Sequence, residues 1–182
     1  MALRVVAGAW GGRRLAAPTG RATRPTAERV REALFAVLGA LDDQRVLDLF
    51  AGSGALGIEA LSRGALHADF VDSDPGAARV LRANLTALGV SSDRARVHQM
   101  PALRALGQAG RARRAYDLVL IDPPYRDAPA LGPVLDRALA PLLSGSGCVV
   151  SESDRRAPLE LGLPMVDERR YGDTLIRFHE AV

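Results

Sequence analysis

Hydrophobic and polar positions form blocks along the chain that predict strands and helices in turn. Short, mostly apolar runs that stop at turn residues predict strands at 46–49, 69–72, 94–98, 116–121 and 147–152. The run at 116–121 lacks a polar alternation, which is typical of a central parallel strand buried on both faces. Helical spacing predicts helices at about 55–63, 75–88 and 130–143, and 164–171 with 174–180 predicts a closing hairpin. The regions 101–114 and 153–162 predict loops.

This alternation predicts a doubly wound α/β sheet in one globular domain. The chain has 182 residues, 48% apolar and 25% charged, which is enough to bury a core. We expect an N-terminal arm, residues 1–25, ahead of the main domain, residues 26–182. No apolar run is long enough for a signal peptide or a membrane span, so we expect a cytoplasmic protein. One cysteine and three scattered histidines predict no disulfide and no metal site.

The first 31 residues carry most of the excess positive charge. They hold seven arginines and one acid, whereas the rest of the chain holds 17 arginines and 20 acids. The stretches 3–9 and 13–17 flank Trp10-Gly11-Gly12, which predicts a β-hairpin with a glycine turn. Thr26 is a candidate N-cap of a helix that reaches about Leu41. Such a basic arm suits a phosphate backbone, with Arg13 and Arg14 as candidate contacts. A solvated arm without a partner is the alternative.

A glycine-rich turn follows the first predicted strand of the main domain. Gly52, Gly54 and Gly57 have the spacing of a nucleotide-binding loop, in which glycines permit a sharp turn and a helix start points N–H groups at a ligand. Asp72 ends the next strand, where it could hold ribose hydroxyls; Asp74 is more suited to cap the following helix, with Pro75 as its first residue. NAD and S-adenosylmethionine (SAM) enzymes both use such a loop, and a purely structural turn is a third interpretation.

The sequence Asp122-Pro123-Pro124-Tyr125 directly follows the strand predicted at 116–121. Each proline fixes its own φ and extends the residue before it, so the Asp122 carboxylate and the turn carbonyls are held rigidly. Carboxylates and proline carbonyls accept hydrogen bonds, which suits an amino group, and Tyr125 offers a face on which a base could stack. The alternative is a stiff loop in which Tyr125 packs on a neighbour.

Together these motifs resemble those of SAM-dependent amino-methyltransferases. The blocks RVVAG at 4–8, GGRRL at 11–15, RPTAERVREALF at 24–35 and AGSGALGIEALSRGA at 51–65 narrow the resemblance to the RsmD-type bacterial methyltransferases of small-subunit ribosomal RNA. The resemblance implies a Rossmann-like SAM-methyltransferase fold: a seven-stranded mixed sheet in the order 3-2-1-4-5-7-6 with helices on both faces, plus the N-terminal β-hairpin.

The resemblance also implies a set of site residues. Substrate-holding positions would be Asp122, Pro123 and Tyr125, and RNA contacts would be Arg13, Arg14 and Arg24. Cofactor-binding positions would be Asp48, Ala51, Gly52, Ser53, Gly54, Asp72 and Met100. Met100 stands where the family usually has a polar or acidic residue near the adenine, so an apolar contact replaces a side-chain hydrogen bond there.

We therefore expect a monomeric enzyme that uses SAM, without a metal, to methylate the N2 amino group of a guanine in 16S rRNA within the small ribosomal subunit or an assembly intermediate. Several alternatives stay open at this point. SAM-dependent methylation of DNA adenine or of a protein amide uses a similar proline turn, usually with Asn first. An NAD-dependent oxidoreductase would share the glycine loop, and a non-catalytic RNA-binding assembly factor would share the basic arm.

Overall fold

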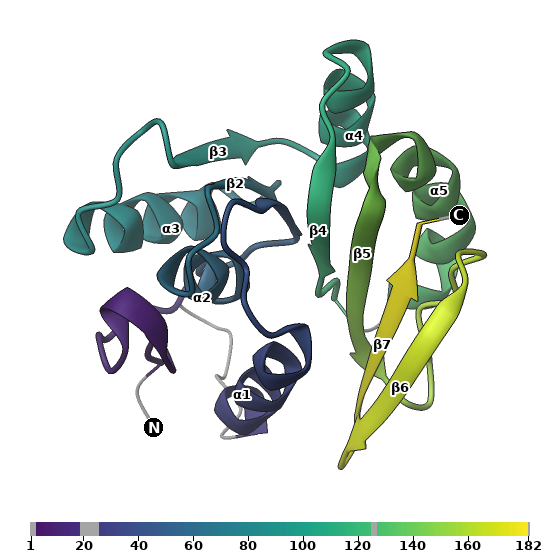
Figure 1. Ribbon diagram of the computed structural model, residues 1–182, viewed down its shortest axis with the longest axis horizontal. Helices are drawn as coiled ribbons and strands as arrows, with labels where there is room; N and C mark the ends of the chain where they lie inside the picture. The colour runs from purple at the N-terminus through teal and green to yellow at the C-terminus, as the bar shows by residue number, and fades with distance from the viewer. Residues whose placement is uncertain (1–2, 19–25, 125–126, 182) are drawn as a thin grey trace.

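The computed structural model describes residues 3–18, 26–124 and 127–181. Its centre is one mixed sheet with the strand order β3-β2-β1-β4-β5-β7-β6 (Figure 1), which confirms the predicted order. The strands are β1 Arg45–Leu49, β2 His67–Asp72, β3 Ala95–Gln99, β4 Tyr116–Ile121, β5 Leu143–Asp154, β6 Met165–Tyr171 and β7 Thr174–Glu180. Strands β1 to β5 pair in parallel, and β7 and β6 add an antiparallel edge.

Helices cover both faces of the sheet. They are α1 Thr26–Leu38, α2 Ala55–Ser62, α3 Pro75–Ala87, α4 Ala102–Arg111 and α5 Ala128–Leu139, with short 3-10 turns at Gly8–Trp10 and Ala140–Leu142. Side chains from α1, α2 and α3 share one hydrophobic core, and those from α4 and α5 share a second. Successive residues of a strand point to opposite faces, so Leu118 and Leu120 of β4 enter the first core while Val119 and Ile121 enter the second.

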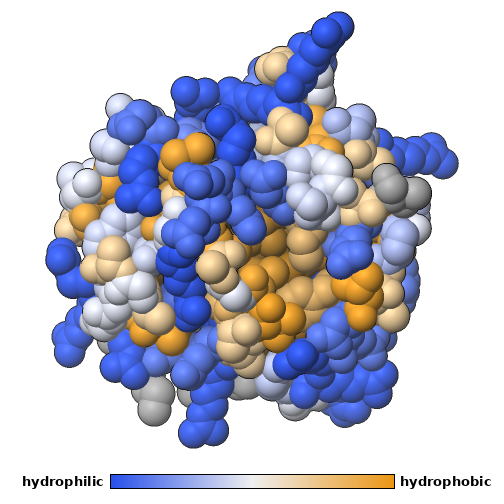
Figure 2. Space-filling view, in the orientation of Figure 1, coloured by the Kyte–Doolittle hydropathy of each residue, from blue (hydrophilic) through white to orange (hydrophobic). Residues whose placement is uncertain are grey.

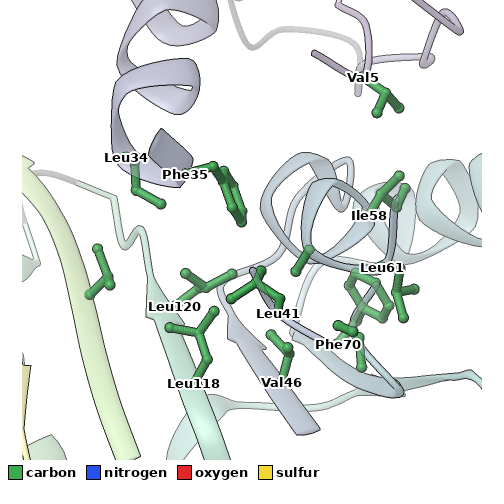
Figure 3. Close-up of a cluster of buried hydrophobic side chains, with 14 of the residues drawn as sticks. Val5, Leu34, Phe35, Leu41, Val46, Ile58, Leu61, Phe70, Leu118 and Leu120 are labelled. Carbon is green, nitrogen blue, oxygen red and sulfur yellow. The ribbon is translucent and has the colours of Figure 1, made fainter. Parts of the chain in front are cut away.

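The first core joins α1 to the middle of the sheet. Leu34 and Phe35 on α1 lie near Leu118 and Leu120 on β4, and Phe70 of β2 lies below α2 (Figure 3). Full burial of side chains of this size stabilises the folded state by roughly 1.5–3 kcal/mol each. This contact places α1 beside the carboxyl ends of β1 and β4, where the candidate site lies.

Two predicted features of the main chain are confirmed at α3 and at the closing hairpin. The Asp74 carboxylate accepts a hydrogen bond from Ala77 N at 2.7 Å, and Pro75 is the first helical residue. Gly172-Asp173 connects β6 and β7 as expected. Proline is favourable at this first helical position because an N–H group there would have no partner within the helix.

The predicted loop at 101–114 is wrong, because α4 occupies most of it. Gly107 and Gly110 lower the helix propensity of this segment, but Ala105, Leu106 and Ala109 are buried on one face against the sheet. Tertiary packing therefore outweighs local propensity here. Other bounds also differ. Helix α1 ends at Leu38, three residues earlier than predicted, and α5 ends at Leu139, four residues earlier than predicted, whereas β5 extends over 12 residues.

The N-terminal hairpin forms only in part. Its two limbs are antiparallel, with Val5 N bonded to Arg13 O and Leu15 N to Leu3 O, both at 2.9 Å. A single bridge joins Arg4 and Arg14, and a 3-10 turn replaces the tight glycine turn, so neither limb is a regular strand. Several other backbone groups of the arm bond to side chains of α2 and α3 instead of to the opposite limb. Thr26 starts α1, but its predicted capping side chain lies outside the described residues.

The surface is mixed in polarity. Figure 2 shows an apolar area near the middle of the face seen in Figure 1, bordered by hydrophilic side chains. In the described part of the chain, no helix combines the length and the apolar character needed to cross a membrane.

Candidate functional site

The candidate site lies where the loop after β1 crosses the carboxyl end of the sheet. Gly52 and Gly54 have φ values of 57° and 81°, in the left-handed region that other residues rarely adopt. Ala51 N donates to Val71 O of the neighbouring strand at 3.0 Å, so the loop is bonded to the end of β2. The strand order places β1 between β2 and β4, and crevices at such strand ends are the usual ligand sites of open α/β sheets.

The three glycine N–H groups of this loop already have protein acceptors. Gly52 N donates to Asp72 Oδ2 at 2.8 Å, Gly54 N to Ala51 O at 2.7 Å and Gly57 N to Asp48 Oδ2 at 2.9 Å. A dinucleotide-binding loop instead offers such groups to a pyrophosphate. Because carboxylates take two of them, the loop favours a ligand with positive charge over one with a diphosphate.

Asp48 is buried beneath the loop, with 1% of its surface exposed. Burial raises the pKa of the Asp48 carboxyl to about 7; the Gly57 N–H opposes this rise, and the charge of Asp72 adds to it. Gly57 lies close to Asp48 because α2 packs tightly on the sheet at this point. A Cβ atom on Gly57 would lie 2.4 Å from Phe70 Cε1. The site therefore holds a carboxyl group that gains or loses a proton near neutral pH.

The Asp72 carboxylate links the loop to the helix that follows β2. Its Oδ2 accepts from Gly52 N and its Oδ1 accepts from Asp74 N, both at 2.8 Å, and the residue is 7% exposed. Each carboxylate oxygen can accept a further bond, so ribose hydroxyls remain compatible with this geometry. Met100 follows β3 at the same edge, where its N–H donates to Asp72 O at 3.0 Å and its half-buried side chain packs on the second core. Asp72 and Met100, both predicted cofactor-binding residues, thus lie at the same edge of the sheet.

The Asp122-Pro123-Pro124 turn lies at the adjacent strand end. Ile121 pairs with Leu49 of β1, and Asp122 N reaches Leu49 O at 3.5 Å, so this turn begins where the glycine loop begins. Pro123 is buried, Asp122 is half-buried, and Pro124 O accepts from Asp127 N at 2.8 Å. The turn is therefore fixed on both sides. Tyr125, the predicted stacking residue, lies outside the described residues.

The N-terminal arm is bonded to the helices that flank the glycine loop. Glu59 of α2 is fully buried and accepts from Val6 N at 2.7 Å and Ala7 N at 3.0 Å. The Glu59 carboxylate also pairs with Arg63 Nε at 2.8 Å, which compensates its burial. The arm is thus packed onto the main domain in residues 3–18 and is not a detached appendage.

The predicted RNA-contacting arginines differ in their surroundings. Arg13 is exposed, yet one of its Nη atoms donates to Ala87 O at the end of α3 at 2.9 Å. Arg14 is exposed and takes part in the backbone bridge with Arg4, which leaves its guanidinium open to solvent. Arg24 lies outside the described residues.

Sequence reasoning missed three residues of this region. Glu59 lies in an otherwise apolar run, and Asn84 shares the buried face of α3 with Leu81 and Leu85. A polar residue at a core position is the signal that could have found both. Phe50, at the start of the glycine loop, has a φ of 62°, which is uncommon for a residue with a side chain and often marks a functional loop.

Comparisons with known proteins show which family the chain belongs to. The model of a family described as conserved hypothetical protein 95 (Cons_hypoth95) matches residues 3–180. The chain is 39% identical to the putative rRNA methyltransferase YlbH of Bacillus subtilis over 184 residues, covering 98% of both chains. It is 42% identical to the ribosomal RNA small subunit methyltransferase D of Escherichia coli K12 over 125 residues, covering 68% of this chain and 61% of that protein.

Solved structures support the fold. The putative methyltransferase YhhF of Escherichia coli superposes with a TM-score of 0.84 at 33% identity, covering 100% of this chain and 98% of that chain. SMU.776, a putative methyltransferase in complex with S-adenosylhomocysteine (SAH), superposes with a TM-score of 0.69 at 16% identity over 86% of this chain and 49% of that chain, which reflects a shared fold. The chain therefore belongs to the Cons_hypoth95 family and has the fold of the SAM-dependent methyltransferases.

Proposed function

We propose that this chain is a methyltransferase that transfers the methyl group of SAM to the exocyclic N2 amino group of a guanine in the 16S rRNA of the small ribosomal subunit. The observation that carries the proposal is the meeting of the glycine loop with the Asp122-Pro123-Pro124 turn at the ends of β1 and β4. The names of the two relatives support rRNA as the substrate class.

The cofactor that fits the loop is SAM, which supplies a methyl group on a positively charged sulfur. Asp48 and Asp72 give this end of the sheet negative charge, which suits a cation better than a diphosphate. Asp72 would accept from the ribose hydroxyls, and Met100 with the half-buried Phe50 would give the adenine an apolar contact. Ala51, Ser53 and the glycines would supply backbone surface that approaches the cofactor closely.

The substrate amine would be held by the proline turn. The lone pair of a guanine N2 is delocalised into the ring, so the reaction depends on holding the nitrogen in line with the methyl group. The Asp122 carboxylate and the Pro123 carbonyl would accept from the two N–H groups and stabilise the positive charge that develops on nitrogen. Tyr125 would stack on the base once it has left its neighbours.

The basic arm would bind the RNA backbone. Arg14 faces solvent and Arg13 lies at the same end of the arm, beside α3. Arginine binds phosphate through two parallel hydrogen bonds, so this surface would orient a large RNA relative to the turn. Contacts between arginine and phosphate give affinity but do not select a base. The proline turn would select the base.

The test is transfer of labelled methyl from SAM to small ribosomal subunits from a strain that lacks this gene, followed by digestion to nucleosides. N2-methylguanosine at one site is the expected product. Label on adenine would overturn the guanine assignment, and transfer only to DNA or protein would overturn the RNA assignment. SAM binding without transfer to any of these substrates would favour a non-catalytic assembly factor, and NAD binding without SAM binding would favour an oxidoreductase.

A further inference from the structure

One buried side chain on α3 joins the N-terminal arm directly to the glycine loop. Asn84 Nδ2 donates to Ser53 O at 2.9 Å and to Ala16 O at 3.0 Å, and its Oδ1 accepts from Ala16 N at 2.8 Å. The residue is 4% exposed. Both donors and the acceptor of this amide are therefore used, which an isosteric carboxylate could not reproduce.

The bond to Ser53 orients the loop. A trans peptide is planar, so its C=O and the following N–H point in opposite directions. Holding the Ser53 carbonyl towards α3 therefore fixes the direction of Gly54 N, which donates to Ala51 O at 2.7 Å. Ser53 also lies between two residues with positive φ, where the backbone is otherwise free to rotate.

The bonds to Ala16 hold the arm. The Asn84 amide accepts from the N–H of Ala16 and donates to its C=O, as the backbone of a neighbouring strand would. The other hydrogen bonds between the arm and the main domain involve Glu28 and Arg31 of α1, Glu59 and Ser62 of α2, and Ala87 O of α3. None of these partners belongs to the glycine loop. Among the hydrogen bonds of the described residues, those of Asn84 alone connect residues 3–18 with residues 50–54.

We infer that Asn84 is a positioning residue that couples cofactor binding at the glycine loop to substrate binding at the arm. Ordering of Ser53 by the cofactor favours the orientation of Asn84 that holds Ala16, and ordering of the arm by RNA favours the bound form of the loop. Linkage makes the effect reciprocal, with a typical coupling of 5- to 150-fold for such systems. The RNA half of this inference rests on the proposed function; the response of the arm to the cofactor does not.

The first test needs no RNA. Amide hydrogen exchange is measured in the wild type, Asn84→Ser and Asn84→Ala, with and without saturating SAH. We expect SAH to slow exchange at Ala16 about tenfold in the wild type and less than twofold in both variants, while exchange at Val6, whose N–H is held by Glu59, responds alike in all three. Equal slowing at Ala16 in the wild type and the variants, or none in the wild type, would overturn the inference.

The second test measures binding of small ribosomal subunits with and without SAH. We expect SAH to tighten binding of subunits about tenfold in the wild type and less than twofold in the Asn84 variants. Thr86→Ala, at an exposed position of the same helix, is the matched control. In this variant SAH should tighten subunit binding as much as in the wild type. If Asn84 had only a structural role, its replacement would lower stability, or the affinities for SAH and for subunits, but SAH would still tighten subunit binding about tenfold.

The two tests separate this inference from the proposed function. If subunits neither bind nor accept methyl groups while SAH still slows exchange at Ala16 through Asn84, the RNA substrate is wrong and the coupling stands. If subunits are methylated but SAH still tightens subunit binding about tenfold in Asn84→Ser, the proposed function stands and the coupling is wrong. Since Asn84→Ser keeps a small polar group, it also covers the case in which Asn84→Ala fails to fold.

Discussion

Replacement of Asp48 by Asn should change how stability depends on pH. In the folded state the Asp48 carboxyl has a pKa of about 7, against 3.8 for an ordinary aspartate. Between these values the folded protein holds a proton that the unfolded chain has lost. The free energy of unfolding of the wild type therefore falls by about 1.4 kcal/mol per pH unit from this group alone, and by about 4 kcal/mol over the whole interval.

The sign follows from the direction of the shift. Because the folded pKa is raised, the stabilising contribution of Asp48 is fully present below pH 3.8 and is lost as the pH rises through 7. Asn has no charge to bury, and its Oδ1 can still accept from Gly57 N. The stability of Asp48→Asn relative to the wild type should thus increase by about 3 kcal/mol between pH 5 and pH 8.

The assay is urea unfolding at several pH values without SAM, with equal slopes for the two proteins as a check that the same surface is exposed. Asp43→Asn, at an exposed position just before β1, is the matched control and should show no such trend. A difference between Asp48→Asn and the wild type that stays constant from pH 5 to pH 8 would refute the burial argument.

Four further predictions follow from the site. Asp122→Ala should lower methyl transfer at least about 100-fold while SAM affinity changes less than about threefold, and an unchanged rate would remove Asp122 from the mechanism. Arg14→Ala should reduce the slope of log affinity for subunits against log salt by about 1 without changing SAM affinity; an unaltered slope would mean that Arg14 meets no phosphate. Gly57→Ala should lower the free energy of unfolding in urea by about 1–3 kcal/mol, because the new Cβ would overlap the Phe70 ring. Gly107→Ala, whose Cβ would meet no atom closer than 3.7 Å, should be neutral or stabilising. Equal stabilities of the two variants would contradict the packing argument. SAM binding at pH 7 should release part of a proton from Asp48, seen as a calorimetric heat that varies with the buffer; a buffer-independent heat would argue against this.

The sheet and most helices could be predicted because local patterns and packing agree there. The runs at 46–49 and 116–121 are mostly apolar and are buried on both faces of the sheet. Asp74-Pro75 is a strong local helix start that the structure confirms. The segment that forms α4 was not predictable in this way, because its buried side chains are mostly alanines and only the neighbouring sheet makes their burial favourable.

For the candidate site, the sequence predicts a set of residues but not their geometry. The spacing of Gly52, Gly54 and Gly57 predicts a loop that binds a nucleotide, but not that the loop's own N–H groups bond to Asp48 and Asp72. That arrangement depends on contacts between residues up to 20 positions apart, which a local pattern does not encode. The same holds for Asn84, whose partners lie 31 and 68 positions away.

The anchoring of the arm by late residues has a consequence for biosynthesis. The arm leaves the ribosome before Glu59 and Asn84, which hold its backbone and follow Val6 and Ala16 by 53 and 68 positions. At elongation rates of about 5–20 residues per second, roughly 3–14 s pass between synthesis of Ala16 and synthesis of its anchor Asn84. During that interval the arm's basic side chains are exposed on a nascent chain beside ribosomal RNA, so N-terminal fusions and slow codons before position 84 should affect yield more than equivalent changes near the C-terminus.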